Sequence, residues 1–356
     1  MLKVAFVDNA GLPYTLDTPY SQPLGGIQSA VCYLAESLVQ QGVECLLING
    51  VTQTLSARGV TAYSIQNFPM HELQSCDVVV AVGSANLGGA LRGAIAEKTP
   101  LLLWTGHAHD QDAVQALSDP VVRGQFTGFV FVSEWQKNHY QTRFQLDRSC
   151  FVLRNAISMP FMALLDEAPA KINPVIAYTS TPFRGLELLL QAFPDIRRAI
   201  PEAECRIYSS MKVYGVAAEQ DQFQALYQKA MQMPGVNYIG SIAQAELAKQ
   251  MKEVAVLAYP NTFEETSCIA VMEAMAAGCQ VVTSALGALP ETMNGYGQLI
   301  PVAGGWKGYQ KRFVRSVIGA LQQKETFDAA EQKKFVEGAY VWPRIAEQWR
   351  QVFLTL

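Results

Sequence analysis

The stretch that decides the fold is YPNTFEETSCIAVMEAMAAGCQVVTSALGALPE, residues 259–291, which places two carboxylates eight residues apart. Residues 254–259 (VAVLAY) are an apolar run that predicts a buried strand, and Pro260 ends that run. Residues 268–277 favour a helix. We therefore expect Glu265 in the connecting loop and Glu273 two turns inside the helix.

The start of this predicted helix suits a ligand that carries both phosphate and sugar. The free amides of its first turn, near residues 266–269, should face the same crevice as both carboxylates, and such termini attract phosphate. Gly278 closes the helix and CQVVTS follows at once as a strand, so the helix should pack on a sheet. Its start then lies at the carboxyl ends of the strands, where open α/β sheets bind ligands. The pattern favours a sugar joined to a nucleoside diphosphate over an ordinary surface glutamate.

Composition limits the class of protein without choosing one. A length of 356 residues predicts about two domains, and 50% hydrophobic residues are enough for two cores. No run of about 18 apolar residues occurs, and MLKVAFVDN does not have the plan of a signal peptide, so we expect a cytoplasmic protein. A net charge of −4 without a long basic run argues against a nucleic-acid partner.

Cysteine usage and local charge add two further expectations. The seven cysteines show no CxxC spacing, which fits neither a disulfide framework nor a zinc site and suits a reducing compartment. Residues 123–154 are locally basic. This segment suits a phosphate-bearing acceptor, a peripheral contact with a membrane surface, or a merely solvated face.

Short apolar strands alternate with amphipathic helices along the chain, which predicts α/β domains with parallel sheets. A polar, proline-containing stretch at 166–174 separates two such series. We expect an N-terminal domain at 1–170, a C-terminal domain at 171–341 and an amphipathic last segment at 342–356 that docks on one of them. The predicted strands are 2–8, 44–49, 77–83, 100–106, 128–133, 150–155, 175–180, 204–209, 236–240, 254–259, 280–284 and 298–301.

The motifs, taken in order, resemble those of the family 4 retaining glycosyltransferases. The E-x7-E element followed by EAMAAG and VVTS is the specific match. Weaker matches are GGIQ at a helix start, FVSEWQK, Asn155 at a strand end, RGLELLLQAF and IPEAE. The resemblance covers essentially the whole chain. It implies the GT-B fold of two facing Rossmann-like domains, with the last segment crossing back to the N-terminal domain.

The resemblance also assigns roles to single residues. Glu273 matches the glutamate that holds the ribose hydroxyls, and Glu265 matches the one near the donor sugar. Arg184, in TSTPFRG, stands where the family usually has Lys and would neutralise the diphosphate, for which its planar fork is suited. The family's second cation is absent, because that position reads Thr179 or Ser180.

The amides around Cys268 and Ile269, with Ser267 beside them, would hold sugar and phosphate of the donor. The family has glycine-rich sequence here, so the choice of donor does not transfer. Cys268 is either a reactive thiol at a helix start or a buried inert thiol. Gly26, after Gly25, allows close approach of the diphosphate or the acceptor to the first helix, unless the pair serves only as a turn.

A histidine-bearing loop, TGHAHDQD, follows the strand LLLW. The resemblance places a functional histidine here, facing the donor sugar, and we choose His107 over His109. Asp110 and Asp112 offer a metal site as a second reading, since DQD mimics a DxD motif, and a polar loop cap is the third. GT-B enzymes usually need no metal for chemistry, so we expect neither metal nor cofactor.

The sequence therefore predicts a retaining glycosyltransferase, with Glu265, His107 and Arg184 as its catalytic residues. It would move a sugar from a nucleoside-diphosphate sugar to a hydroxyl of a carbohydrate, lipid or protein acceptor. Arg184 and helix amides would stabilise the departing nucleoside diphosphate. The long connection at 9–24 is predicted to be an acceptor-side loop. Two other classes stay open: another GT-B enzyme, such as a nucleotide-sugar epimerase or glycosyl phosphorylase, and a catalytically silent GT-B protein used for interaction.

Overall fold

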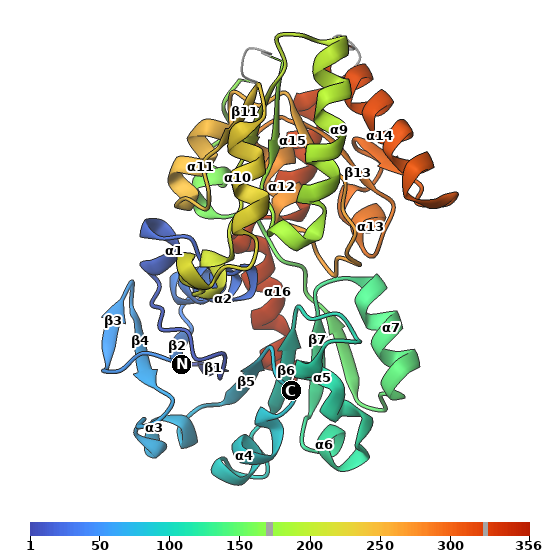
Figure 1. Cartoon of the computed structure of the whole chain (residues 1–356). Coiled ribbons are helices and arrows are strands. Elements are labelled where there is room, and N and C mark those ends of the chain that lie inside the picture. Colours follow the sequence, from blue (N-terminus) through green and yellow to red (C-terminus); the bar gives the residue numbers. More distant parts are fainter. Residues whose placement is uncertain (169–173, 323–326) are drawn as a thin grey trace. The chain divides into compact units, whose positions relative to one another are not determined.

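A computed structural model describes residues 1–168, 174–322 and 327–356. The chain divides into two compact units, each of which is an α/β sheet with its helices (Figure 1). The predicted domain boundary at residue 170 lies outside the described residues. The first unit comprises Met1–Pro19, Gly25–Ala156 and Tyr340–Leu356, and the second comprises Tyr20–Leu24 and Ile157–Ala339.

The sheet of the first unit has the strand order β3-β4-β2-β1-β5-β6-β7-β8. Every neighbouring pair is parallel except β3 with β4, which is antiparallel. All residues of β5 and β6 are buried, as expected for parallel strands covered on both faces. The strands are β1 (Lys3–Asp8), β2 (Glu44–Asn49), β3 (Leu55–Ala57), β4 (Val60–Ser64), β5 (Val78–Val82), β6 (Leu101–Thr105), β7 (Gly128–Phe131) and β8 (Ser149–Val152).

The last helix, α16 (Trp342–Thr355), belongs to the first unit and packs on α2 (Gly26–Gln40), which confirms the predicted return of the chain. Its apolar stripe explains why it docks, because Trp349 lies 5.0 Å from Trp104 and 6.4 Å from Phe6, measured between ring centroids. The other helices of this part of the chain are α1 (Thr18–Ser21), α3 (Met70–Gln74), α4 (Leu87–Ala94), α5 (Asp112–Gln115), η1 (Ala116–Ser118), α6 (Pro120–Gly124) and α7 (Glu134–Phe144).

The sheet of the second unit is parallel throughout, in the order β11-β10-β9-β12-β13-β14. The chain winds outward in one direction from β9 and in the other from β12, so the topological switch point lies between these two strands. Their carboxyl ends are therefore the expected place for a ligand. The strands are β9 (Val175–Tyr178), β10 (Glu204–Ile207), β11 (Val236–Tyr238), β12 (Val256–Tyr259), β13 (Gln280–Ser284) and β14 (Gln298–Ile300).

Helices of the second unit surround this sheet (Figure 1). In the described parts of the chain, no helix combines the length and the apolar character needed to cross a bilayer. The helices are α8 (Met159–Met162), η2 (Pro182–Arg184), α9 (Leu186–Ala199), η3 (Met211–Tyr214), η4 (Ala218–Gln220), α10 (Gln224–Gln232), α11 (Gln244–Met251), α12 (Ile269–Ala276), α13 (Leu289–Met293), α14 (Gly305–Gln322) and α15 (Ala329–Ala339).

Candidate functional site

Two loops meet at the switch point of the second unit. One follows β9 and carries Arg184, and the other follows β12 and carries Glu265. Gly185 makes the close approach possible: it has a φ of +122°, and a Cβ there would lie 2.1 Å from the Pro260 carbonyl oxygen. The backbone N–H of Thr262 donates to the carbonyl oxygen of Arg184 at 3.3 Å. The fold therefore joins two predicted site residues that stand 81 positions apart.

Arg184 and Glu265 form a buried ion pair. Arg184 Nη1 donates to both carboxylate oxygens of Glu265, each at 3.0 Å, and the Tyr259 hydroxyl donates to Oε1 at 2.5 Å. The Glu265 side chain is 4% exposed and that of Arg184 is 23% exposed. Both carboxylate oxygens of Glu265 thus have protein partners, and the carboxylate fixes the position of the cation.

The guanidinium of Arg184 has N–H groups that no described residue accepts. Its hydrogen bonds within the described residues use only Nη1, and Nε is buried without a partner. Its central carbon lies 4.7 Å from the ring centroid of Phe263 and 5.4 Å from that of Phe183, which orients the plane. Burial lowers the pKa of Arg184, but the neighbouring Glu265 carboxylate outweighs this effect and the pKa is raised overall. The group is therefore a permanent cation whose Nε and Nη2 can bind an anion.

The loop after β9 and the loop that leads into α12 each hold a polar group without a partner. Ser267 Oγ and Thr181 Oγ1 are buried and make no hydrogen bond within the described residues. Cys268 is the N-cap residue of α12, and Ile269 is the first helical residue. Burial raises the pKa of the Cys268 thiol well above its usual value, which favours the inert of its two readings. Buried donors and acceptors are normally paired, so these two hydroxyl groups remain available to hydrogen-bond a ligand.

Neutral side chains occupy the position of the absent second cation. Thr179 is partly buried directly after β9. Ser180 Oγ lies 3.2 Å from the Tyr259 hydroxyl, which in turn donates to Glu265. Among the described residues, Thr179 and Ser180 thus offer hydroxyl groups where the resemblance implies a second cation.

Glu273 lies nearer the start of its helix than the sequence predicted, and its side chain is buried. Because α12 begins at Ile269, Glu273 is its fifth residue and lies about one turn from the start, so the expected two turns are wrong. Its Oε1 accepts a hydrogen bond from the backbone N–H of Ser158 at 3.2 Å. Burial raises its pKa to about 7, against the opposing effects of Ser158 and Gln244. A carboxyl group with this pKa changes its charge near neutral pH.

The first unit holds the predicted histidine after β6. His107 Nδ1 lies 3.2 Å from Gln111 Oε1, which also accepts from the backbone N–H of Ala108 at 2.8 Å. Because that oxygen can only accept, Nδ1 must carry the proton and Nε2 presents a lone pair. Burial lowers the pKa of His107, so the ring is neutral at pH 7. Nε2 faces Gly83, where a Cβ would lie 3.4 Å away.

Gly26 is the first residue of α2, and the N-cap residue Gly25 makes no side-chain cap bond. Nearby, the buried carboxylate of Asp8 ends β1. Asp8 accepts hydrogen bonds from the Tyr14 hydroxyl at 2.8 Å, from Gln28 Nε2 at 3.0 Å and from a backbone N–H at 2.8 Å. Tyr14 therefore anchors the long connection after β1, and its side chain is not presented to solvent.

The second histidine, His109, has different surroundings. The centre of its ring lies 5.4 Å from that of His139, with the two planes tilted by 34°, and its Nδ1 is buried without a partner among the described residues. Within the described residues, no group of three or more His, Cys, Asp and Glu side chains is arranged to hold a metal ion. Asp110 is exposed. The DQD sequence thus gains no third ligand from the part of the chain that the structure describes.

Comparison with known proteins agrees with this fold. Residues 173–309 match the family model described as Glycosyl transferases group 1. Over 123 residues the chain is 29% identical to a phosphatidyl-myo-inositol mannosyltransferase of Mycobacterium tuberculosis, a match that covers 34% of this chain and 30% of that relative.

Two solved structures resemble the whole chain. A sucrose-phosphate synthase from Thermosynechococcus elongatus has a TM-score of 0.72 at 16% identity, and each chain is covered completely. Anabaena HepE, in a complex with UDP and glucose, has a TM-score of 0.71 at 15% identity, again over both full chains. The chain therefore has the GT-B fold, and residues 173–309 of its second unit are similar to the glycosyl transferases group 1 family.

The structure unites only part of the predicted site. Arg184, Glu265, Ser267 and the start of α12 gather in the second unit, whereas Glu273 has its own partners. His107 and Gly26 belong to the first unit. Sequence reasoning missed the unpaired hydroxyl of Thr181 and the residues around the predicted groups, which are Tyr259, Ser158, Gln244, Gln111 and Asp8. Only Tyr259 gave a signal, as a polar-tipped residue at the very end of an apolar strand.

Proposed function

We propose that this protein is a retaining glycosyltransferase of the family 4 type, which transfers a sugar from a nucleoside-diphosphate sugar to an acceptor hydroxyl. The proposal rests on the burial and the hydrogen bonds of Arg184. This residue is a partly buried cation, fixed by Glu265, that still has unused N–H groups and lies close enough to Cys268, the N-cap residue of α12, to interact with it electrostatically. A diphosphate needs such donors, and a helix N-terminus adds favourable dipoles.

Each residue then has a role in the transfer. The bond between the anomeric carbon and the diphosphate oxygen breaks, and Arg184 with the amides of Ser267, Cys268 and Ile269 stabilises the negative charge that develops on that oxygen. The hydroxyl of Thr179 supplies a further donor in place of the second cation. Glu265 keeps Arg184 in position and stands at the donor sugar.

Two further residues bind the ribose and the sugar of the donor. Glu273, in its ionised form, accepts hydrogen bonds from the ribose hydroxyls. His107 is neutral, and its Nε2 lone pair accepts a hydrogen bond from a hydroxyl of the donor sugar. The acceptor oxygen forms its new bond on the face that the diphosphate leaves, and its proton passes to the departing diphosphate oxygen, so an α-linked donor gives an α-glycoside. No metal ion and no cofactor takes part in this chemistry.

The relatives support the substrate classes. HepE is known in a complex with UDP and glucose, and the mannosyltransferase is named for phosphatidyl-myo-inositol. We infer a nucleoside-diphosphate sugar as the donor and a cytoplasmic site of action. A lipid acceptor would bring the protein into peripheral contact with a membrane.

The test is a transfer reaction followed by NMR. Nucleotide sugars are first screened by thermal shift, because a ligand at 100 times its Kd stabilises the folded protein by about 2.7 kcal/mol. The selected donor is then incubated with acceptors, and the anomeric configuration of the first product is recorded. Retention supports the proposal, and an inverted product contradicts it. Product from the donor alone would indicate an epimerase, dependence on free phosphate would indicate a phosphorylase, and binding without turnover would indicate a silent protein.

A further inference from the structure

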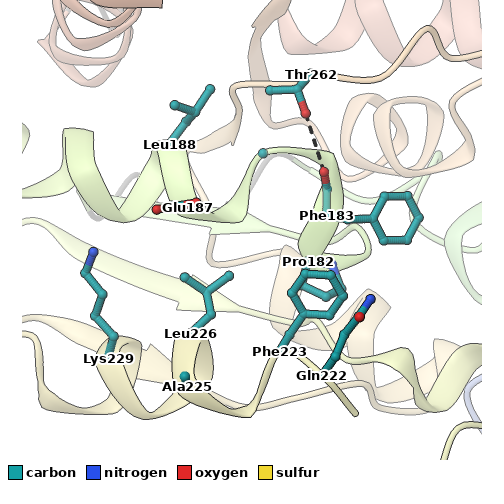
Figure 2. A pocket seen from close by; sticks show the side chains of 11 residues that line it. Pro182, Phe183, Glu187, Leu188, Gln222, Phe223, Ala225, Leu226, Lys229 and Thr262 are labelled. Carbon is teal, nitrogen blue, oxygen red and sulfur yellow. Dashed lines mark hydrogen bonds between the residues drawn. The ribbon is translucent and has the colours of Figure 1, made fainter.

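A pocket opens in the second unit between the start of α9 and the start of α10 (Figure 2). Its volume of about 750 Å³ lies within the range of small-molecule sites. Rings and aliphatic side chains make most of its wall, and a lysine stands at the end opposite Phe183. The residues that matter here are Pro182, Phe183, Leu188, Phe223, Leu226 and Lys229.

The aromatic end of this pocket is held in place before any ligand binds. Asp221 is buried, and its Oδ1 accepts from the backbone N–H of Phe223 at 3.0 Å. Its Oδ2 accepts from the Tyr227 hydroxyl at 2.9 Å and from the backbone N–H of Met211 at 3.0 Å. The Phe223 ring lies 6.4 Å from that of Phe183, which is 41% exposed. A fixed wall of exposed rings favours an apolar occupant, because binding it costs little reordering.

The pocket adjoins the site proposed for the donor diphosphate. Phe183 lines the pocket, and its neighbour Arg184 carries the unused N–H groups. Thr262 also lines the pocket, and its N–H donates to the Arg184 carbonyl while its hydroxyl donates to the Phe183 carbonyl (Figure 2). A molecule seated against Phe183 and Thr262 therefore lies beside the loop that fixes Arg184.

We propose that this pocket binds the apolar part of an amphipathic acceptor. The inference rests on the proposed function, since it assigns the occupant as the second substrate. The apolar group packs on Phe223, Leu188 and Leu226, and the end that carries the reacting hydroxyl points toward Phe183. Lys229 makes no ion pair within the described residues, so its aliphatic stem covers the far end of the apolar group while its ammonium stays in water.

The test uses two glucosides that differ only in their apolar group. Calorimetry measures the binding of n-octyl β-D-glucopyranoside, below its critical micelle concentration, and of methyl β-D-glucopyranoside, both without any donor. We expect the octyl glucoside to bind at least about tenfold more tightly. A nucleoside diphosphate should not displace it, since displacement would make this the site of the donor's base and overturn the proposal.

Two variants on α10 locate the binding. Leu226→Asp places a charge in the pocket wall and should abolish the preference for the octyl glucoside. Met231→Asp makes the same change on the same helix at a side chain that is 49% exposed and outside the wall, and should preserve the preference. Three results would overturn the proposal: equal affinity of the wild-type protein for the two glucosides, a Leu226→Asp variant that keeps the preference for the octyl glucoside, or the same loss of that preference in both variants. Because no donor is present, this outcome is independent of the transfer assay: octyl binding here with no transfer from any donor would remove the proposed function and leave an apolar-ligand site.

Discussion

Each sheet has a buried carboxylate beside its topological switch point, but the two carboxylates have different hydrogen-bond partners. In the first unit, Asp8 accepts hydrogen bonds from neutral donors, among them Tyr14 and Gln28. In the second unit, Glu265 pairs with Arg184, which retains unused N–H groups. The first arrangement is complete in itself and anchors a loop. The second leaves donors that only a ligand or water can satisfy, which is the mark of a binding site.

The glycines at the two switch points give the largest expected difference. In Gly185→Ala, the new Cβ would lie 2.1 Å from a carbonyl oxygen, and the alanine would also have to keep an unfavourable positive φ. Together these two effects should reduce the free energy of unfolding by about 4 kcal/mol. Gly83→Ala has only the unfavourable φ of +78°, with its nearest neighbour at 3.4 Å, and should cost about 1 to 2 kcal/mol. Urea denaturation measures both. Equal losses would show that the loops after β9 and β12 do not depend on this close approach.

Breaking the charged pair should cost more than breaking the neutral cluster. Arg184→Ala leaves Glu265 buried without its cation and should reduce the free energy of unfolding by about 3 kcal/mol. Tyr14→Phe removes one hydrogen bond of several to Asp8 and should cost about 1 kcal/mol. The same denaturation experiment compares them. A Tyr14→Phe variant that loses more than Arg184→Ala would reverse the distinction between the two regions.

Glu273 should make the free energy of unfolding depend on pH. Its pKa is raised to about 7 in the folded protein, so the folded state holds a proton that the unfolded state loses above about pH 4.5. The stabilising contribution is therefore complete below pH 4.5 and is lost as the pH rises through 7, a change of about 3 kcal/mol. Glu273→Gln should lack this part of the pH profile. Parallel stability profiles of the two proteins between pH 4.5 and 8 would contradict the buried environment of Glu273.

The sequence predicted the parallel strands well because they are short apolar runs with clear ends. It missed β3, a three-residue strand with two exposed residues, and β4, in which only Val60 and Ala62 are buried; the turn between them places Arg58 at a positive φ. Contacts between distant segments were also out of reach. Nothing in TSTPFRG shows that Arg184 pairs with Glu265, and nothing in MEAMAAG shows that Glu273 meets Ser158. Those pairs depend on which loops meet in the folded protein, and the hydrophobic periodicity of a segment does not contain that information.

Removal of divalent metal ions should have the smallest effect. Arg184 and the helix amides supply the proposed charge stabilisation, so EDTA should leave the affinity for a nucleoside diphosphate and the transfer rate unchanged. The check is calorimetry and a transfer assay with and without chelator. Activity that EDTA abolishes and a divalent ion restores would bring Asp110 and Asp112 of the first unit into the site.

The central claim is that the Arg184–Glu265 pair of the second unit binds the donor diphosphate. The most direct measurement is the calorimetric affinity of the double variant Arg184→Gln with Glu265→Gln for the nucleoside diphosphate that stabilises the wild-type protein most. This variant removes both charges without leaving either one buried and unpaired, so it should fold with nearly wild-type stability. We expect its affinity to fall at least about tenfold, while His107→Gln in the first unit binds within about twofold of wild type. A double variant that binds as tightly as the wild-type protein would contradict the account.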